Sequence, residues 1–411
     1  MEKMSCKKIS IIHGINIFFA CCYMIVFWVP FIKYLTGSFY QHIGVCCLAG
    51  WIITSLLIEG YKITFRYSFK LCASIYIFFM VCCAFLGIGD AQSVIMGYSA
   101  FWFFAIMISF YIDKKLNREL RIIITVMFVI IIITNFTTIF ANIRYSNISK
   151  MKGYTLLDDQ IYNRLNVGKY DYITALSISY PVFMFLHAKR QNICCAMLLV
   201  SSAVAVVLSG YTIASIMLLI GILFGYIAVS GKKYSPYICV IAISVFLCIF
   251  SSYFLNLLKG INNHLYERIQ ELIGFLFTES VGGYFNSGDL QGRVVEYLRS
   301  LRVFENHIFW GLGPIYSDIT NAGRIGMHSQ IFDDMARYGI VSVVLFAAFL
   351  KSYYHYMCHV STESIKVVKV ILFLFSITAL LNPLFTSATV GFMFLFIIPG
   401  ILNIVVCAKG E

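Results

Sequence analysis

The stretch that decides the fold is residues 121–142, which read RIIITVMFVIIIITNFTTIFAN. Its only charged residue is Arg121, at the first position, and the remainder is rich in isoleucine, valine, phenylalanine and threonine. A helix of roughly 20 apolar residues crosses the hydrocarbon core of a bilayer, which is about 30 Å thick. This stretch therefore predicts a transmembrane helix.

Similar apolar windows recur along the chain and predict about twelve spans. They lie near 11–31, 41–58, 69–88, 93–112, 121–142, 171–187, 192–209, 211–229, 236–258, 339–357, 366–382 and 388–408. Because only Ser209-Gly210-Tyr211-Thr212 separates the seventh window from the eighth, eleven spans is the alternative. We expect an all-α, polytopic integral membrane protein, with residues 1–411 forming a single transmembrane domain.

The composition agrees with this expectation. Hydrophobic residues make up 60% of the chain and charged residues only 12%, against roughly 25% charged in soluble domains. An ordinary soluble enzyme is thereby excluded. The net charge of +12 is interpreted first as a topology signal, not as a site for nucleic acid.

Basic residues gather in the short loops on one side of the predicted bundle. Short cytoplasmic loops are enriched in lysine and arginine, so we assign these loops and both termini to the cytoplasm. The residues are Lys3, Lys7, Lys8, Lys62, Arg66, Lys70, Lys114, Lys115, Arg118, Arg121, Lys189, Arg190, Lys232, Lys233, Lys351, Lys366, Lys369 and Lys409.

Two long segments, 143–170 and 259–338, are then extracytoplasmic, and the second lies between the ninth and tenth spans. It holds six of the twelve arginines of the chain: Arg268, Arg293, Arg299, Arg302, Arg324 and Arg337. A guanidinium presents a planar fork that binds phosphate or carboxylate oxygens in bidentate fashion. The arginines therefore favour an anionic ligand, and the alternative is that they pair with the nine acidic residues of the same segment.

Residues 291–306 of this segment have helical periodicity and predict an amphipathic helix. Val294, Leu298 and Leu301 share one face, and Arg293, Glu296, Arg299 and Ser300 lie on the opposite arc. We expect the helix to lie against the membrane or the bundle.

The shorter outer segment combines basic and aromatic residues. Arg164 and Lys169 accompany several tyrosines and suit a sugar-phosphate acceptor, although aromatic residues are also common at any membrane interface. No C-x-x-C spacing occurs among the fourteen cysteines. We therefore expect neither a metal site nor a cofactor.

A spaced motif links Gly292-Arg293, Trp310-Gly311-Leu312-Gly313, His328-Ser329 and Gly339-Ile340. This pattern resembles the O-antigen polymerase (Wzy) and O-antigen ligase superfamily of bacterial envelope glycosyltransferases. The general layout of spans and late outer loop matches along nearly the whole chain, whereas the motif covers only the residues from Gly292 to Ile340. Ser329 stands where ligases more often have asparagine, which favours the polymerase.

The resemblance implies a GT-C-like fold, the bacterial cytoplasmic membrane, and a glycan on undecaprenyl diphosphate as the donor. It implies a metal-independent, inverting transfer that builds O-antigen or capsular polysaccharide on the outer face of the membrane. Arg293 and His328 are then the candidate catalytic residues. The candidate substrate-binding residues are Arg268, Arg299, Arg302, Arg324, Arg164 and Lys169.

Other functions remain open at this point. A ligase would transfer glycan to another acceptor, and a flippase or carrier would need ionisable residues or broken helices near mid-membrane. Because the spans carry almost no charge at their centres, we favour the enzyme. Its expected partners are the lipid-linked oligosaccharide, membrane lipid, a chain-length regulator and a flippase, with no nucleic acid.

Overall fold

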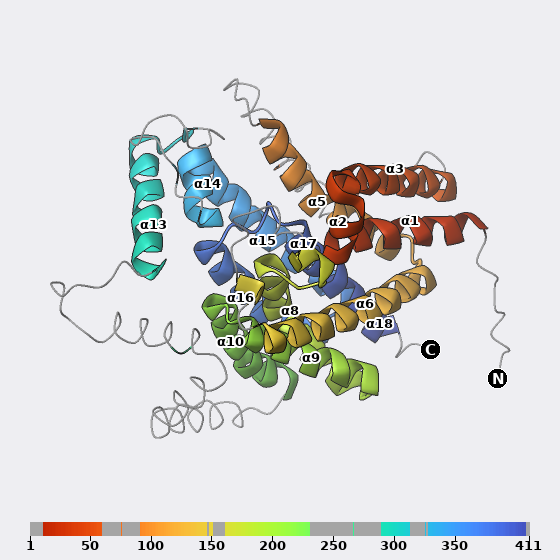
Figure 1. Cartoon of the computed structure of the whole chain (residues 1–411). Helices are drawn as coiled ribbons and strands as arrows, with labels where there is room; N and C mark the ends of the chain where they lie inside the picture. Colours follow the sequence, from red (N-terminus) through yellow and green to blue (C-terminus); the bar gives the residue numbers. More distant parts are fainter. Residues whose placement is uncertain are drawn as a thin grey trace.

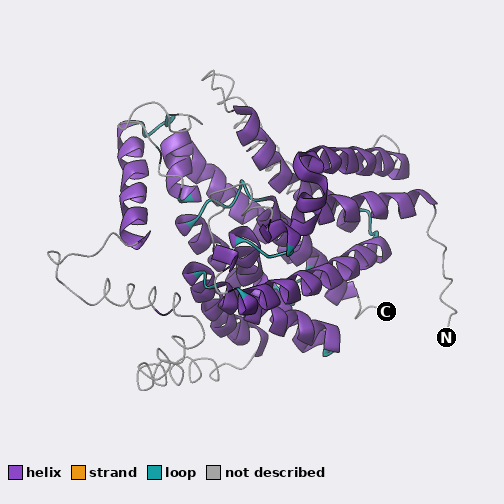
Figure 2. Cartoon of the chain, viewed as in Figure 1, coloured by secondary structure: helices purple, strands orange, loops and turns teal. Residues whose placement is uncertain are grey.

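The computed structural model describes residues 11–59, 75, 91–145, 148–150, 161–230, 266, 289–312, 325 and 328–407. In this part of the chain every regular element is helical, and no strand occurs (Figures 1 and 2). The elements are α1 (Ile11–Trp28), α2 (Pro30–Thr36), η1 (Gly37–Phe39), α3 (Tyr40–Glu59), α5 (Ala91–Asp113), α6 (Asn117–Arg144), η2 (Ile148–Lys150), α8 (Tyr170–Arg190), α9 (Ile193–Ser209), α10 (Thr212–Ser230), α13 (Asp289–Asn306), α14 (Gln330–Tyr338), α15 (Ile340–Val360), α16 (Ile365–Leu381), α17 (Ala388–Gly391), η3 (Phe392–Ile397) and α18 (Ile398–Cys407).

Length and composition allow six helices of the described residues to cross a membrane. They are Ile11–Trp28, Tyr40–Ile58, Asn117–Arg144, Thr212–Ser230, Ile340–Val360 and Ala388–Val405. This result agrees with a polytopic membrane protein. The predicted spans 69–88 and 236–258 lie outside the described residues, except for Ile75, so the total of about twelve stays a prediction.

The seventh and eighth predicted spans are separate helices. α9 ends at Ser209, and Gly210 adopts the left-handed conformation with φ 70° and ψ 10° before α10 begins at Thr212. Because glycine has no Cβ, it adopts this conformation at little cost and ends the helix.

Hydrogen bonds at one end of the bundle join segments from the whole length of the chain. His13 Nδ1 lies 2.7 Å from Glu119 Oε1, Asn403 donates to Asn117, and Lys189 pairs with Glu363. The start of α1 and the end of α18 lie at this end, and α13 lies at the other (Figure 1). The described basic positions Lys114, Arg118 and Lys189, next to these bonds, are therefore at the end of the bundle away from α13.

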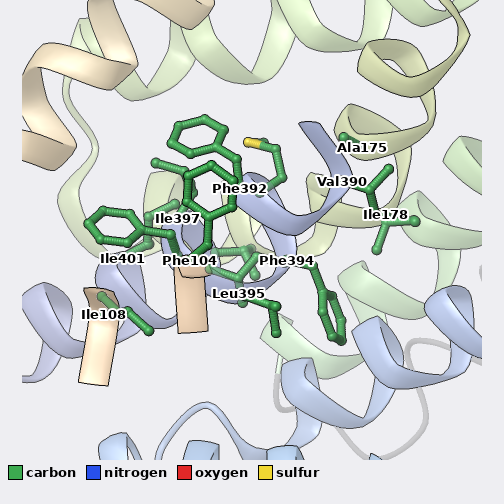
Figure 3. Close-up of a cluster of buried hydrophobic side chains, with 14 of the residues drawn as sticks. Phe104, Ile108, Ala175, Ile178, Val390, Phe392, Phe394, Leu395, Ile397 and Ile401 are labelled. Carbon is green, nitrogen blue, oxygen red and sulfur yellow. The ribbon is translucent and has the colours of Figure 1, made fainter. Parts of the chain in front are cut away.

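The core is built around the segment α17, η3 and α18. In the window Ala388–Val405, 89% of the residues are buried inside the protein. Figure 3 shows side chains of α5 and α8 around it, including Phe104 and Ile178. Phe394 lies in η3, which is a π-helical segment. Its ring stacks on the Phe375 ring with centroids 3.9 Å apart, and its backbone carbonyl accepts a hydrogen bond from the Tyr353 hydroxyl.

A buried polar network joins α1, α3 and α5. The Asn16 amide donates to the neighbouring hydroxyls of Thr54 and Ser55, at 2.9 Å each. Its carbonyl oxygen accepts from the Tyr111 hydroxyl at 2.6 Å. The hydrocarbon of a bilayer offers these polar groups no other hydrogen-bond partner. The bonds therefore fix the positions of the three apolar helices relative to one another.

The same arrangement recurs between α6, α8 and α9. The Asn135 amide donates to Ser201 and Ser202 at 3.0 Å each, and its oxygen accepts from Tyr172 at 2.5 Å. Each network thus pairs one asparagine with two adjacent hydroxyls on a second helix and a tyrosine on a third.

We expect Asn135→Leu to lower the stability of the detergent-solubilised protein by about 1–2 kcal/mol, because three buried hydroxyls lose a partner. The measurement is the midpoint of thermal unfolding. Thr125→Val is the matched control on the same helix, since the Thr125 hydroxyl is exposed and donates to the backbone carbonyl of Arg121 in its own turn. Equal midpoints for the two variants would contradict the structural role of Asn135.

Candidate functional site

Helix α13 crosses the end of the bundle opposite α1 and α18 and packs against α14 (Figure 1). Two side chains attach it to the end of α16. Arg293 Nη1 donates to Asn382 Oδ1 at 3.2 Å, and the Tyr297 hydroxyl donates to the Leu381 carbonyl at 3.0 Å. Arg293 is therefore held against the bundle, half-buried, instead of extending freely from its helix.

Gln330, the first residue of α14, organises the same turn after α16. Its side-chain oxygen accepts from the backbone N–H groups of Leu384 and Phe385 at 2.9 and 2.8 Å. Its own backbone N–H donates to the Asn382 carbonyl at 3.1 Å. Asn382 therefore connects Arg293 to the segment that begins with His328, two residues before Gln330.

Asp333 fastens α13 to α14. Its carboxylate accepts from the Ser300 hydroxyl at 2.7 Å and from the Ser329 backbone N–H at 3.1 Å. Burial raises the pKa of Asp333, and the positive charge of Arg337 and these hydrogen bonds oppose the increase. The buried carboxylate thus fixes the loop that carries His328, whose side chain is exposed.

The glycines of the motif form a second fastening, between the turn after α13 and the junction of α14 with α15. Gly311 and Gly339 have φ values of +63° and +65°. A Cβ at Gly311 would overlap the backbone of Arg337, and one at Gly339 would overlap the backbone of Ile308 and Phe309. Two backbone hydrogen bonds close the contact, from Leu312 N–H to the Ala336 carbonyl and from Ile340 N–H to the Ile308 carbonyl, at 2.8 and 2.7 Å. We call this contact the glycine clamp.

The first outer segment meets α13 at the start of α8. The Arg293 guanidinium lies beside the phenol of Tyr170, and the Tyr170 ring packs edge-on against Tyr211, which directly precedes α10. Next to it, the exposed Asp171 carboxylate interacts with the Ser387 hydroxyl. Segments far apart in sequence therefore supply a cation, a phenol and a carboxylate to one small region.

The candidate substrate-binding residues differ from Arg293 in their surroundings. Arg299 bonds both carboxylate oxygens of Glu296 in its own helix, at 3.0 and 2.8 Å. Arg302 is exposed and lies about 2.5 turns after Arg293, hence on the opposite side of α13. Arg164 is exposed, and the Lys169 ammonium lies 5.1 Å from the centre of the Tyr162 ring. Arg268 and Arg324 lie outside the described residues.

The sequence alone did not single out several residues of the site, Gln330, Asn382 and Asp171 among them. A usable signal existed for Asn382, because it precedes Pro383 at the end of an apolar span, where a polar side chain marks the membrane boundary. Gln330 and Asp171 stand among many polar residues near helix ends, and their positions become meaningful only through contacts that are distant in sequence.

The helical fold and the site define a membrane protein whose polar groups converge at the end of the bundle opposite α1 and α18. Residues 196–347 match the model of a family described as O-antigen ligase. The matched range contains Arg293, His328 and both glycines of the clamp. The match supports the O-antigen ligase and polymerase superfamily, as the motif predicts, and thereby a membrane glycosyltransferase-like enzyme of envelope polysaccharide assembly. No curated protein matches the chain significantly.

Among the described residues, no group of three or more histidine, cysteine, aspartate or glutamate side chains is arranged to hold a metal ion. Arg293 and Asp171 bring a positive and a negative charge to the site, with His328 on the adjoining loop. Their chemistry suits the binding of a phosphate and the transfer of a proton.

Proposed function

We propose that the protein polymerises undecaprenyl-diphosphate-linked oligosaccharide repeat units into O-antigen or capsular polysaccharide on the outer face of the bacterial cytoplasmic membrane. The observation that carries the proposal is the position of Arg293, which Asn382 holds at the end of the bundle beside the loop of His328. The family match over the same residues supports this chemistry.

In the proposed reaction, a hydroxyl oxygen of the acceptor glycan attacks the anomeric carbon of the donor. The bond from that carbon to the diphosphate oxygen breaks, and undecaprenyl diphosphate leaves with the bonding electrons. Negative charge grows on the leaving group in the transition state, so a fixed guanidinium binds the transition state more strongly than the ground state. We assign this role to Arg293.

His328 accepts the proton of the attacking hydroxyl. A neutral imidazole carries one unprotonated ring nitrogen, which can accept a proton. The other arginines, Arg268, Arg299, Arg302 and Arg324, with Arg164 and Lys169, remain proposed contacts for donor or acceptor phosphates. Inversion at the anomeric carbon follows from a single attack opposite the leaving group, without a metal.

Ser329 helps little in choosing between polymerase and ligase. Its hydroxyl accepts from the Phe332 backbone N–H at 3.1 Å and caps α14. Serine and asparagine are comparable helix caps, so either residue does this work. The polymerase therefore rests on the resemblance of the whole motif, and the family description favours the ligase as the second candidate.

Gel analysis of polysaccharide in cells that lack the gene separates the candidates. We expect loss of long polymer, with single repeat units left on the carrier or on lipid A core. A ligase defect would instead leave long polymer on the carrier, and a flippase defect would leave units on the inner leaflet. Persistence of long polymer after replacement of both Arg293 and His328 by alanine would refute the assigned site.

A further inference from the structure

Three consecutive large apolar residues follow α13 and remain exposed. Ile308 is 47% exposed, Phe309 71% and Trp310 75%. We call them the apolar tip. The turn that displays them is ordered by hydrogen bonds from His307 N–H to Phe304 and from Gly311 N–H to His307. Such a patch on a protein surface marks an interaction site.

The apolar tip is fixed at the point where the chain enters a membrane-crossing helix. The Ile308 carbonyl accepts from the backbone N–H of Ile340 at 2.7 Å, and Ile340 is the first residue of α15, a candidate span. Ile340 and Val344 are also exposed, Val344 by 62%. The exposed surface of the tip therefore continues onto the exposed side of α15, a candidate span.

The orientation of α13 also indicates that its exposed face is turned toward the bilayer interface. Ser300 and Val303 are buried against the protein, whereas the opposite, mostly apolar face with Val294, Val295 and Leu298 is exposed, together with Arg302. A helix on a water-soluble protein would bury this apolar face. A helix at a bilayer interface presents it to the acyl chains, and tryptophan is enriched at that depth.

We propose that the apolar tip inserts into the lipid interface on the side of the bundle opposite Ile11 and Cys407, and that it holds α13 at the depth of the lipid headgroups. The occupant of the surface is the bilayer, because the surface is continuous with the lipid-facing side of α15. Insertion fixes the height of Arg293, on the same helix, relative to the phosphates of the membrane. This proposal does not depend on the reaction assigned above.

Tryptophan fluorescence tests the insertion. The chain has four tryptophans, and Trp28, Trp51 and Trp102 are at most 3% exposed. The difference between the wild-type protein and Trp310→Phe, both in phospholipid nanodiscs, therefore isolates the signal of Trp310. We expect phosphatidylcholine brominated at shallow acyl positions to quench this signal strongly, and aqueous acrylamide to quench it weakly.

Either of two results would overturn the proposal. Strong quenching by acrylamide without quenching by brominated lipid would place Trp310 in water. Little quenching by either agent would mean that protein covers the tip, from a second copy of this chain. As a second variant, Phe309→Ser is expected to reduce lipid quenching of Trp310 at least twofold, and unchanged quenching would count against a wedge formed by the whole tip.

Discussion

Arg293→Ala lowers the rate of repeat-unit transfer by roughly 10²–10³-fold, the loss typical when one fixed donor to a developing charge is removed. The measurement is transfer by the purified protein, with lipid-linked units from cells that lack the gene as substrate. The effect is large because Asn382 and the Tyr170 phenol orient the guanidinium before substrate arrives. Preorganised charge stabilises a transition state without the cost of reorientation.

Two variants define the specificity of this result. Arg293→Lys keeps the charge and loses the planar fork, so we expect it to recover only a small part of the rate. Arg144→Ala is the matched control, because Arg144 ends α6 and stacks on Tyr145, outside the site. An equal loss of rate in Arg144→Ala and Arg293→Ala, or a normal rate in Arg293→Ala, would refute the role of Arg293.

Gly339→Ala is expected to disrupt the backbone contact of the glycine clamp and to abolish polymer formation. The substitution forces a side chain into a positive φ and into the backbone of Ile308 and Phe309. Strain of the first kind costs about 1–3 kcal/mol, and overpacking adds a similar amount. Limited proteolysis of the purified protein should show faster cleavage near residues 307–312, and the thermal midpoint should fall.

Gly292→Ala is the control for the clamp. Gly292 also belongs to the motif, but a Cβ at this position meets nothing within 4 Å. Alanine in a helix is more favourable than glycine by about 0.5–1 kcal/mol, so we expect unchanged or slightly higher stability. Equal protection from protease in Gly339→Ala and Gly292→Ala would contradict the clamp. Gly311→Ala should behave like Gly339→Ala, because its side chain would overlap the backbone of Arg337.

The helical class was predictable because roughly 20 apolar residues in succession have few stable alternatives in a bilayer. The break at Gly210 was visible as the weak boundary between two windows. Other features depend on contacts. No local pattern distinguishes Asn16 or Asn135 from an ordinary polar residue within a span, because their role comes from hydroxyls on two further helices.

The motif was visible in the sequence, but the structural role of each of its residues was not. Sequence alone treated the Gly311 and Gly339 positions as marks of a family, whereas the structure assigns them to one backbone contact. Arg293 and Arg299 looked equivalent on one arc of α13. Arg293 donates to Asn382, because it faces the turn after α16. Arg299 does not face this turn and pairs with Glu296 in its own helix.

The burial of Ala388–Val405 has a consequence for biogenesis. This segment follows every other described helix in chain order, yet the helices α5 and α8 surround it. The helices α5 and α8 are therefore inserted into the membrane before the segment that packs between them. Until residues 388–405 are inserted, lipid fills the space between these helices or the helices remain loosely packed. The centre of the bundle is therefore filled after the helices α5 and α8 that surround it, and a ribosome stalled before residue 388 would leave these helices without their central contacts.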